Sequence, residues 1–120
     1  MTGRVMVVDD EPAILDVLRL ILEDDGYEVV TATRQDEIRT DQTRPDLILL
    51  DIWLSGVNGK EICRQLKGDP ATRHIPVILV SANRDTAAIA EDCGADGSIS
   101  KPFDLDAVLD LVRRHLDRAA

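Results

Sequence analysis

At 120 residues, 44% of them hydrophobic, the chain is long enough for one domain with a single core and too short for two. The formal net charge of −9 argues against direct nucleic-acid binding, which requires a basic face to neutralise phosphates. No signal peptide opens the chain and no apolar run approaches the roughly 18 residues of a membrane-spanning helix, so we expect a soluble, cytoplasmic protein with no membrane partner.

The first third of the chain alternates strand and helix patterns. A continuous apolar run at 5–8 predicts a buried strand, and a broad apolar stripe that begins after Pro12 predicts a helix. A weaker strand signal follows at 27–32. The next crossover, 33–44, is too polar for a core-facing helix, since Ile38 is its only large apolar residue. We expect a short or poorly packed helix there.

The alternation continues to the end of the chain. The predicted elements are, in order, a strand at 47–50, a helix over 59–67 capped by Asn58, a strand at 77–80, a helix at 85–92 ended by Gly94, a strand at 97–100 and a helix from Asp104. Strands that are apolar at every position are typical of a parallel sheet covered on both faces. The fold class is therefore α/β, with a doubly wound five-stranded parallel sheet and helices on both faces.

Polar residues stand where the predicted strands end. Asp9 and Asp10 follow the first strand, Asp51 follows the third, Ser81 the fourth and Lys101 the fifth. All strands of a parallel sheet end at the same edge, and ligands bind there. A solvated helix cap would explain the acid pair alone, but it does not explain five such residues on four strand ends.

These residue types favour phosphoryl chemistry on a metal. Oxygen-only ligands suit a hard cation, and Mg²⁺ prefers one or two carboxylates, retained waters and a phosphate. Lys101 can pair with a carboxylate at rest or with phosphoryl oxygens, and the Ser81 hydroxyl can donate to a phosphoryl oxygen. One carboxylate could then act as a nucleophile toward phosphorus. Cys63 and Cys93 lack the spacing of a zinc site, and we expect buried free thiols.

The sequence resembles the receiver domains of two-component response regulators and is similar to the single-domain chemotaxis regulators. The resemblance rests on "VVDDEP", "DLILLDIWLSGVNG", "IPVILVSA" and "GADGSISKPF", in this order and at family-like spacing, and it covers essentially the whole chain. It implies one receiver domain over 1–120 with the flavodoxin-like strand order 2-1-3-4-5. It also implies a protein that is not an enzyme beyond its own phosphorylation and dephosphorylation.

The resemblance assigns a role to each residue of the set. Asp51 matches the phosphoacceptor aspartate, Ser81 the switch hydroxyl and Lys101 the conserved-type lysine of the family. Asp9 and Asp10 match the acid pair that holds Mg²⁺ together with Asp51, with Asp10 the more direct ligand and Asp9 acting mainly through water. The backbone carbonyl of Trp53 matches a further metal ligand.

The resemblance also implies partners. The phosphoryl group would come from a sensor histidine kinase or a histidine phosphotransfer protein. The signal would pass to a downstream protein, or to a C-terminal effector domain if the chain belongs to a longer protein.

Three positions depart from the family pattern. The family usually carries Pro where this chain has Ser55, and Trp53 is large for a position beside the metal. The family usually has Tyr or Phe three residues before the lysine, where this chain has Ser98. The last departure bears on the signalling output rather than on phosphorylation.

Three alternatives stay open from the residues. A Mg²⁺-dependent phosphohydrolase also uses an aspartyl phosphate, but it needs a second acid to activate water and a lid over its substrate. A flavodoxin-like cofactor binder needs a phosphate-binding loop after the first strand, where this chain has carboxylates. A degenerate receiver would only bind partners.

Overall fold

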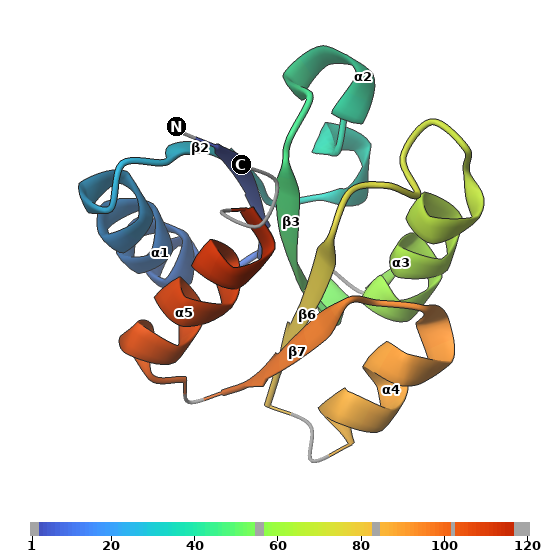
Figure 1. Ribbon diagram of the computed structural model, residues 1–120. Helices are drawn as coiled ribbons and strands as arrows, with labels where there is room; N and C mark the ends of the chain where they lie inside the picture. The colour runs from blue at the N-terminus through green and yellow to red at the C-terminus, as the bar shows by residue number, and fades with distance from the viewer. Residues whose placement is uncertain (1–2, 55–56, 83–84, 102, 117–120) are drawn as a thin grey trace.

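A computed structural model describes residues 3–54, 57–82, 85–101 and 103–116. The core is a five-stranded parallel sheet in the order β2-β1-β3-β6-β7 (Figure 1). Its strands are β1 (Arg4–Val8), β2 (Glu28–Ala32), β3 (Leu47–Asp51), β6 (Val77–Ser81) and β7 (Gly97–Ser100). The predicted α/β class and the predicted strand order are both confirmed.

Each central strand is buried on both faces because its side chains alternate between two cores. In β1, Met6 and Val8 face one core, while Val5 and Val7 face the other. Strands β3 and β6 alternate in the same way. A strand with no solvent-facing side needs apolar residues throughout, which is the reason the sequence showed uninterrupted runs.

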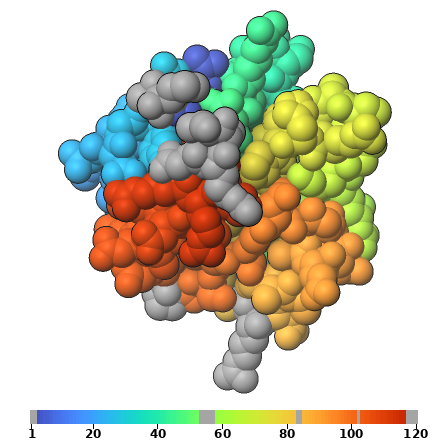
Figure 2. All heavy atoms as spheres, in the orientation of Figure 1, coloured from blue at the N-terminus to red at the C-terminus, as the bar shows by residue number. Residues whose placement is uncertain are grey.

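Helices cover both faces. Helices α1 (Pro12–Asp24) and α5 (Leu105–Leu116) lie on one face, and α3 (Gly59–Gly68) and α4 (Thr86–Cys93) lie on the other (Figure 1). In the space-filling view α5, in red, lies at the surface of the face shown (Figure 2). Asn58 caps α3 as predicted, since its Oδ1 accepts a hydrogen bond from the Lys60 N–H at 2.9 Å. Gly94 ends α4 in the left-handed conformation at φ 82°.

The second crossover contains only a 3₁₀ turn, η1 (Gln35–Glu37), and the four-residue helix α2 (Thr40–Thr43). Neither element has a buried residue, although Ile38 packs against the edge of the α3–α4 core. This confirms the prediction of a short, poorly packed helix. In the preceding strand, β2, only Ala32 is buried.

A small hairpin, which the sequence did not predict, follows β3. Strand β4 (Trp53–Leu54) pairs antiparallel with β5 (Val57–Asn58) and leads into α3. Ser55 lies outside the described residues, and of Trp53 only the backbone is described. None of the described helices is long and apolar enough to cross a membrane.

Candidate phosphoacceptor and metal site

Three carboxylates meet at the carboxyl edge of the sheet. Asp9 and Asp10 directly follow β1, and Asp51 is the last residue of β3. One carboxylate oxygen from each lies within 4.8 Å of the other two. Asp9 and Asp51 are buried, at 2% and 6% exposure, whereas Asp10 is exposed. Within the described ranges, this is the group of acidic, histidine or cysteine side chains whose spacing suits a metal ion.

Lys101 brings a positive charge to these acids from the end of β7. Its Nζ lies 3.2 Å from Asp9 Oδ2 and 3.9 Å from Asp51 Oδ1. Burial alone would lower the pKa of Lys101, but the charges of Asp51 and Asp9 and the hydrogen bond to Asp9 raise it above its ordinary value. The lysine therefore stays protonated.

Asp9 is held at both of its oxygens. Oδ1 accepts the Glu11 backbone N–H at 2.9 Å, and Oδ2 accepts Lys101. The Asp9 backbone N–H donates to the Ala32 carbonyl at 3.1 Å, which ties the residue to the end of β2. With both oxygens occupied, Asp9 is less accessible to a metal than the exposed Asp10.

Ser81 lies on the strand next to Asp51. In the β3–β6 register Asp51 is opposite Val80, so Ser81 stands one residue beyond it at the same edge, buried at 2% exposure. The Ser81 carbonyl accepts the Lys101 N–H at 2.8 Å. The structure thus brings Asp9, Asp10, Asp51, Ser81 and Lys101 to one edge.

Gly59 fixes the backbone beneath the site. A Cβ at this position would lie 2.8 Å from Ile52 Cα and 2.9 Å from Ile52 O, closer than real side chains approach. The Gly59 N–H also donates to the Ile52 carbonyl. The absence of a side chain lets the start of α3 pack directly on the residue that follows Asp51.

Glu11 also lies at this site, although it is not among the site residues predicted from the sequence. Its Oε1 lies 3.8 Å from Lys101 Nζ, and its side chain is 63% exposed. Its position directly after the acid pair in "VVDDEP" was the available signal. Three carboxylates thus lie within 3.9 Å of Lys101, and Asp10 lies beside Asp9 and Asp51. A hard dication would offset the remaining negative charge, and the oxygen-only donor set fits Mg²⁺.

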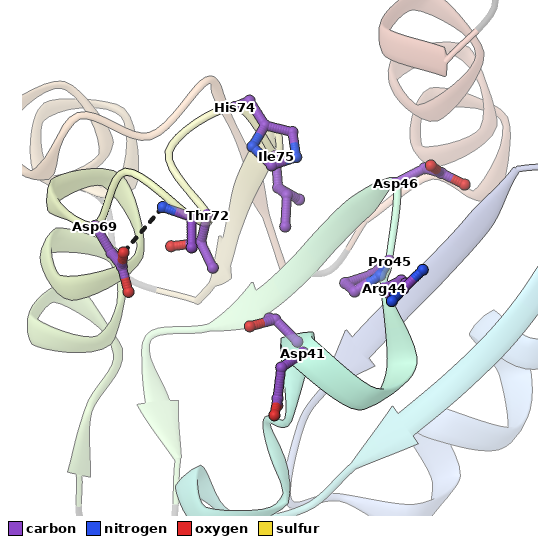
Figure 3. Close-up of a pocket in the computed structure, with 10 residues that line it drawn as sticks. Asp41, Arg44, Pro45, Asp46, Asp69, Thr72, His74 and Ile75 are labelled. Atoms are coloured by element: carbon purple, nitrogen blue, oxygen red, sulfur yellow. Dashed lines mark hydrogen bonds between the residues drawn. The ribbon is translucent and has the colours of Figure 1, made fainter.

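A large cavity, about 710 Å³, lies at the opposite edge of the sheet (Figure 3). It opens between the α2–β3 connection and residues 69–75, where the short α2 leaves space. Two of its carboxylates hold the backbone: Asp46 Oδ2 accepts the Arg4 N–H at 2.8 Å, and Asp69 Oδ1 accepts the Ala71 N–H at 2.9 Å. This cavity does not contribute to the acidic site.

Both cysteines are buried free thiols between α3 and α4, as predicted. Burial, followed by interaction with Cys93, raises the pKa of the Cys63 thiol. A buried thiol that resists ionisation is a poor nucleophile.

The chain resembles known proteins over most of its length. The family model described as "Response regulator receiver domain" matches residues 5–113. The phosphate regulon transcriptional regulatory protein PhoB of Rhizobium meliloti is 38% identical over 99% of this chain and 54% of its own length. The chain thus spans about half the length of the curated relatives it matches.

Solved structures show the same fold. The signal receiver domain of a signal transduction histidine kinase from Syntrophus aciditrophicus is 35% identical with a TM-score of 0.87, over 97% of this chain and 91% of that one. A CheY-like response regulator receiver domain protein from Methanospirillum hungatei is 29% identical with a TM-score of 0.88, over 98% and 96%. The chain belongs to the response regulator receiver domain family of two-component signalling.

Proposed function

We propose that this chain accepts a phosphoryl group on Asp51 in a Mg²⁺-dependent reaction and thereby changes its interactions with a partner. The observation that carries the proposal is the convergence of Asp9, Asp10 and Asp51 with Lys101 at one sheet edge. Family membership supports it, because receiver domains act with histidine kinases. The proposal treats 1–120 as one receiver domain, and a cytoplasmic location stays a prediction.

Asp10 and Asp51 supply the metal ligands in this proposal, with the Trp53 carbonyl as a further one and Asp9 acting through water. A bound Mg²⁺ would neutralise charge on the phosphoryl oxygens. The exposed position of Asp10 and the two occupied oxygens of Asp9 favour this division of roles. Lys101 would exchange its contact with Asp9 or Asp51 for a phosphoryl oxygen.

The transfer itself is a substitution at phosphorus. A carboxylate oxygen of Asp51 forms a bond to phosphorus while the phosphorus–nitrogen bond of a phosphohistidine donor breaks, and the donor imidazole keeps the electron pair. The Ser81 hydroxyl would donate a hydrogen bond to an oxygen of the transferred phosphoryl group. Positioning and charge neutralisation supply most of the catalysis in such reactions, and these residues provide both.

Intact-mass analysis after incubation with a small phosphodonor tests the proposal. Wild type should gain the mass of one phosphoryl group with Mg²⁺ and none with a chelator. Asp10→Asn should be labelled much more slowly, whereas Asp41→Asn, an exposed acid at the opposite edge, should match wild type. Equal labelling with Mg²⁺ and with a chelator would contradict the proposal. Continuous release of phosphate over many turnovers would favour a phosphohydrolase.

The output depends on the partner that binds this domain or is joined to it. The name of PhoB describes a transcriptional regulatory protein, and this chain matches about half of it. We propose that a downstream protein, or an effector domain on the same polypeptide, reads the phosphorylated state. The acidic receiver itself would not contact nucleic acid, given its net charge of −9.

A further inference from the structure

Helix α4 has few large apolar side chains with which to hold its place. Its buried residues are Thr86, Ala90 and Cys93, with Ile89 partly buried. By contrast, α1 buries three leucines. Burial energy scales with apolar area, so α4 is held to the sheet less firmly than α1.

An ion-pair cluster joins the carboxyl end of α4 to α3. Asp92 Oδ2 lies 2.6 Å from Lys60 Nζ and 2.7 Å from Arg64 NH2, so one carboxylate takes two cations from the neighbouring helix. Arg64 is itself oriented by Glu61, 2.9 Å from its NH1. The hydrogen bond and charge of Lys60, with the charge of Arg64, lower the pKa of Asp92 and keep it ionised.

The amino end of α4 is joined to the acidic site by a short stretch of chain. Strand β6 ends at Ser81, and α4 begins five residues later at Thr86, which is 1% exposed. A displacement of Ser81 toward a phosphoryl group on Asp51 would therefore act on the first turn of α4. Figure 1 shows α4 beside α3 on the same face of the sheet.

We propose that Asp92, held by Lys60 and Arg64, is a latch that keeps α4 against α3 and sets how readily α4 moves when the site is phosphorylated. The first half of the inference, that Asp92 holds α4 against α3, stands alone. The second half, the effect on the response to phosphorylation, rests on the proposed function. Exposed ion pairs contribute little singly, but two cations share this carboxylate on a helix with little apolar anchorage. Because the latch favours the resting position, it opposes the change that phosphorylation favours.

Hydrogen exchange in the absence of any phosphoryl group tests the first half. In Asp92→Asn the amides of 86–93 should exchange faster by about two- to fivefold, with α1 and α5 unchanged. Glu91→Gln, which neutralises the adjacent exposed acid, should match wild type. A double-mutant cycle with Lys60→Met should be non-additive. Equal exchange of 86–93 in Asp92→Asn and wild type would overturn the latch, and so would additivity in the cycle.

Binding of beryllium trifluoride with Mg²⁺, a mimic of the phosphoryl group, tests the second half. Asp92→Asn should bind the mimic more tightly than wild type by about two- to fivefold, with Glu91→Gln unchanged. A change that is merely structural would weaken binding or leave it unaltered, and either result would overturn the coupling. Failure of wild type to bind the mimic would contradict the proposed function and the coupling, while the exchange result stands separately.

Discussion

Lys101 Nζ donates to Asp9 Oδ2 at 3.2 Å although the two residues are 92 positions apart in the chain. The contact joins the end of β7 to the end of β1 across the edge of the sheet. Asp51 Oδ1 is more distant from the same nitrogen, at 3.9 Å. In the resting structure the lysine is thus shared, and its nearest partner is Asp9 rather than Asp51.

Replacing Lys101 by methionine should destabilise the fold because Asp9 and Asp51 would face each other with their counter-charge removed. The expected loss is about 1–3 kcal/mol without Mg²⁺, since removing the counter-charge from buried carboxylates is costly. Adding Mg²⁺ should recover part of that loss by supplying positive charge at the same place. Urea denaturation of wild type and variant, with and without Mg²⁺, measures both quantities, and a loss that Mg²⁺ leaves unchanged would contradict the shared-charge account.

Gly59→Ala should destabilise the protein by about 1–3 kcal/mol, because its methyl group would collide with the Ile52 backbone. Gly68 provides the matched control at the other end of α3: nothing lies within 4 Å of a Cβ there. Gly68→Ala should be neutral or stabilise by about 0.4–1 kcal/mol. Thermal melts should therefore show a lower melting temperature for Gly59→Ala and no decrease for Gly68→Ala. Equal decreases in the two variants would show that contact with the Ile52 backbone does not set the cost at Gly59.

The pairing of Asp25 with Arg113 should make stability depend on pH in the acid range. Arg113 donates from NH2 to Oδ1 at 2.6 Å and from Nε to Oδ2 at 2.9 Å. These hydrogen bonds lower the pKa of Asp25 below its ordinary value of 3.8. A group with a lowered pKa in the folded state adds stability above its unfolded pKa and loses it as the pH falls.

Asp25→Asn should accordingly be less stable than wild type near neutral pH, and the difference should shrink as the pH falls through 3.8 and below. Asp24→Asn, at the exposed neighbouring acid, serves as the control and should change stability little. Denaturation midpoints over a pH series measure the effect. A difference that grows on acidification would have the wrong sign.

Particular residues show why most of the fold was predictable. The runs at 5–8, 47–50 and 77–80 are apolar because both faces of those strands are buried, and that constraint is visible in the letters alone. The crossover at 33–44 is polar because α2 buries no residue, so the shortness of this helix was also predictable. The β4–β5 hairpin was missed because strands of two residues have no periodicity to detect.

Sheet topology made the convergence of the site residues predictable, but not the contacts between their side chains. Parallel strands deliver Asp9, Asp51 and Lys101 to one edge whatever the details, so their convergence follows from the strand pattern. The nearer approach of Lys101 to Asp9, and the inclusion of Glu11, depend on side-chain geometry. The Asp92 ion pairs depend on how α4 lies against α3, which no local pattern encodes.

Ser98 should not act as a conformational switch when the site is phosphorylated. It is partly buried in β7 beside a cavity of about 360 Å³ that is also lined by residues of α5. The Ser98 side chain is too small to fill the space that the Tyr or Phe usual at this position in the family would occupy, and it buries much less area. Amide chemical shifts on adding beryllium trifluoride and Mg²⁺ should change most near Ser81 and less over 95–110, and equally large changes over 95–110 would refute this.

The central claim is that Asp51 receives the phosphoryl group, and locating the modified residue tests it most directly. Protein treated with a small phosphodonor and Mg²⁺ is reduced with borohydride, which converts an aspartyl phosphate to homoserine, and is then digested and sequenced by mass spectrometry. The account predicts homoserine at position 51 in wild type and no conversion in Asp51→Asn. Conversion at Asp9 or Asp10 instead, or equal labelling of Asp51→Asn, would contradict it.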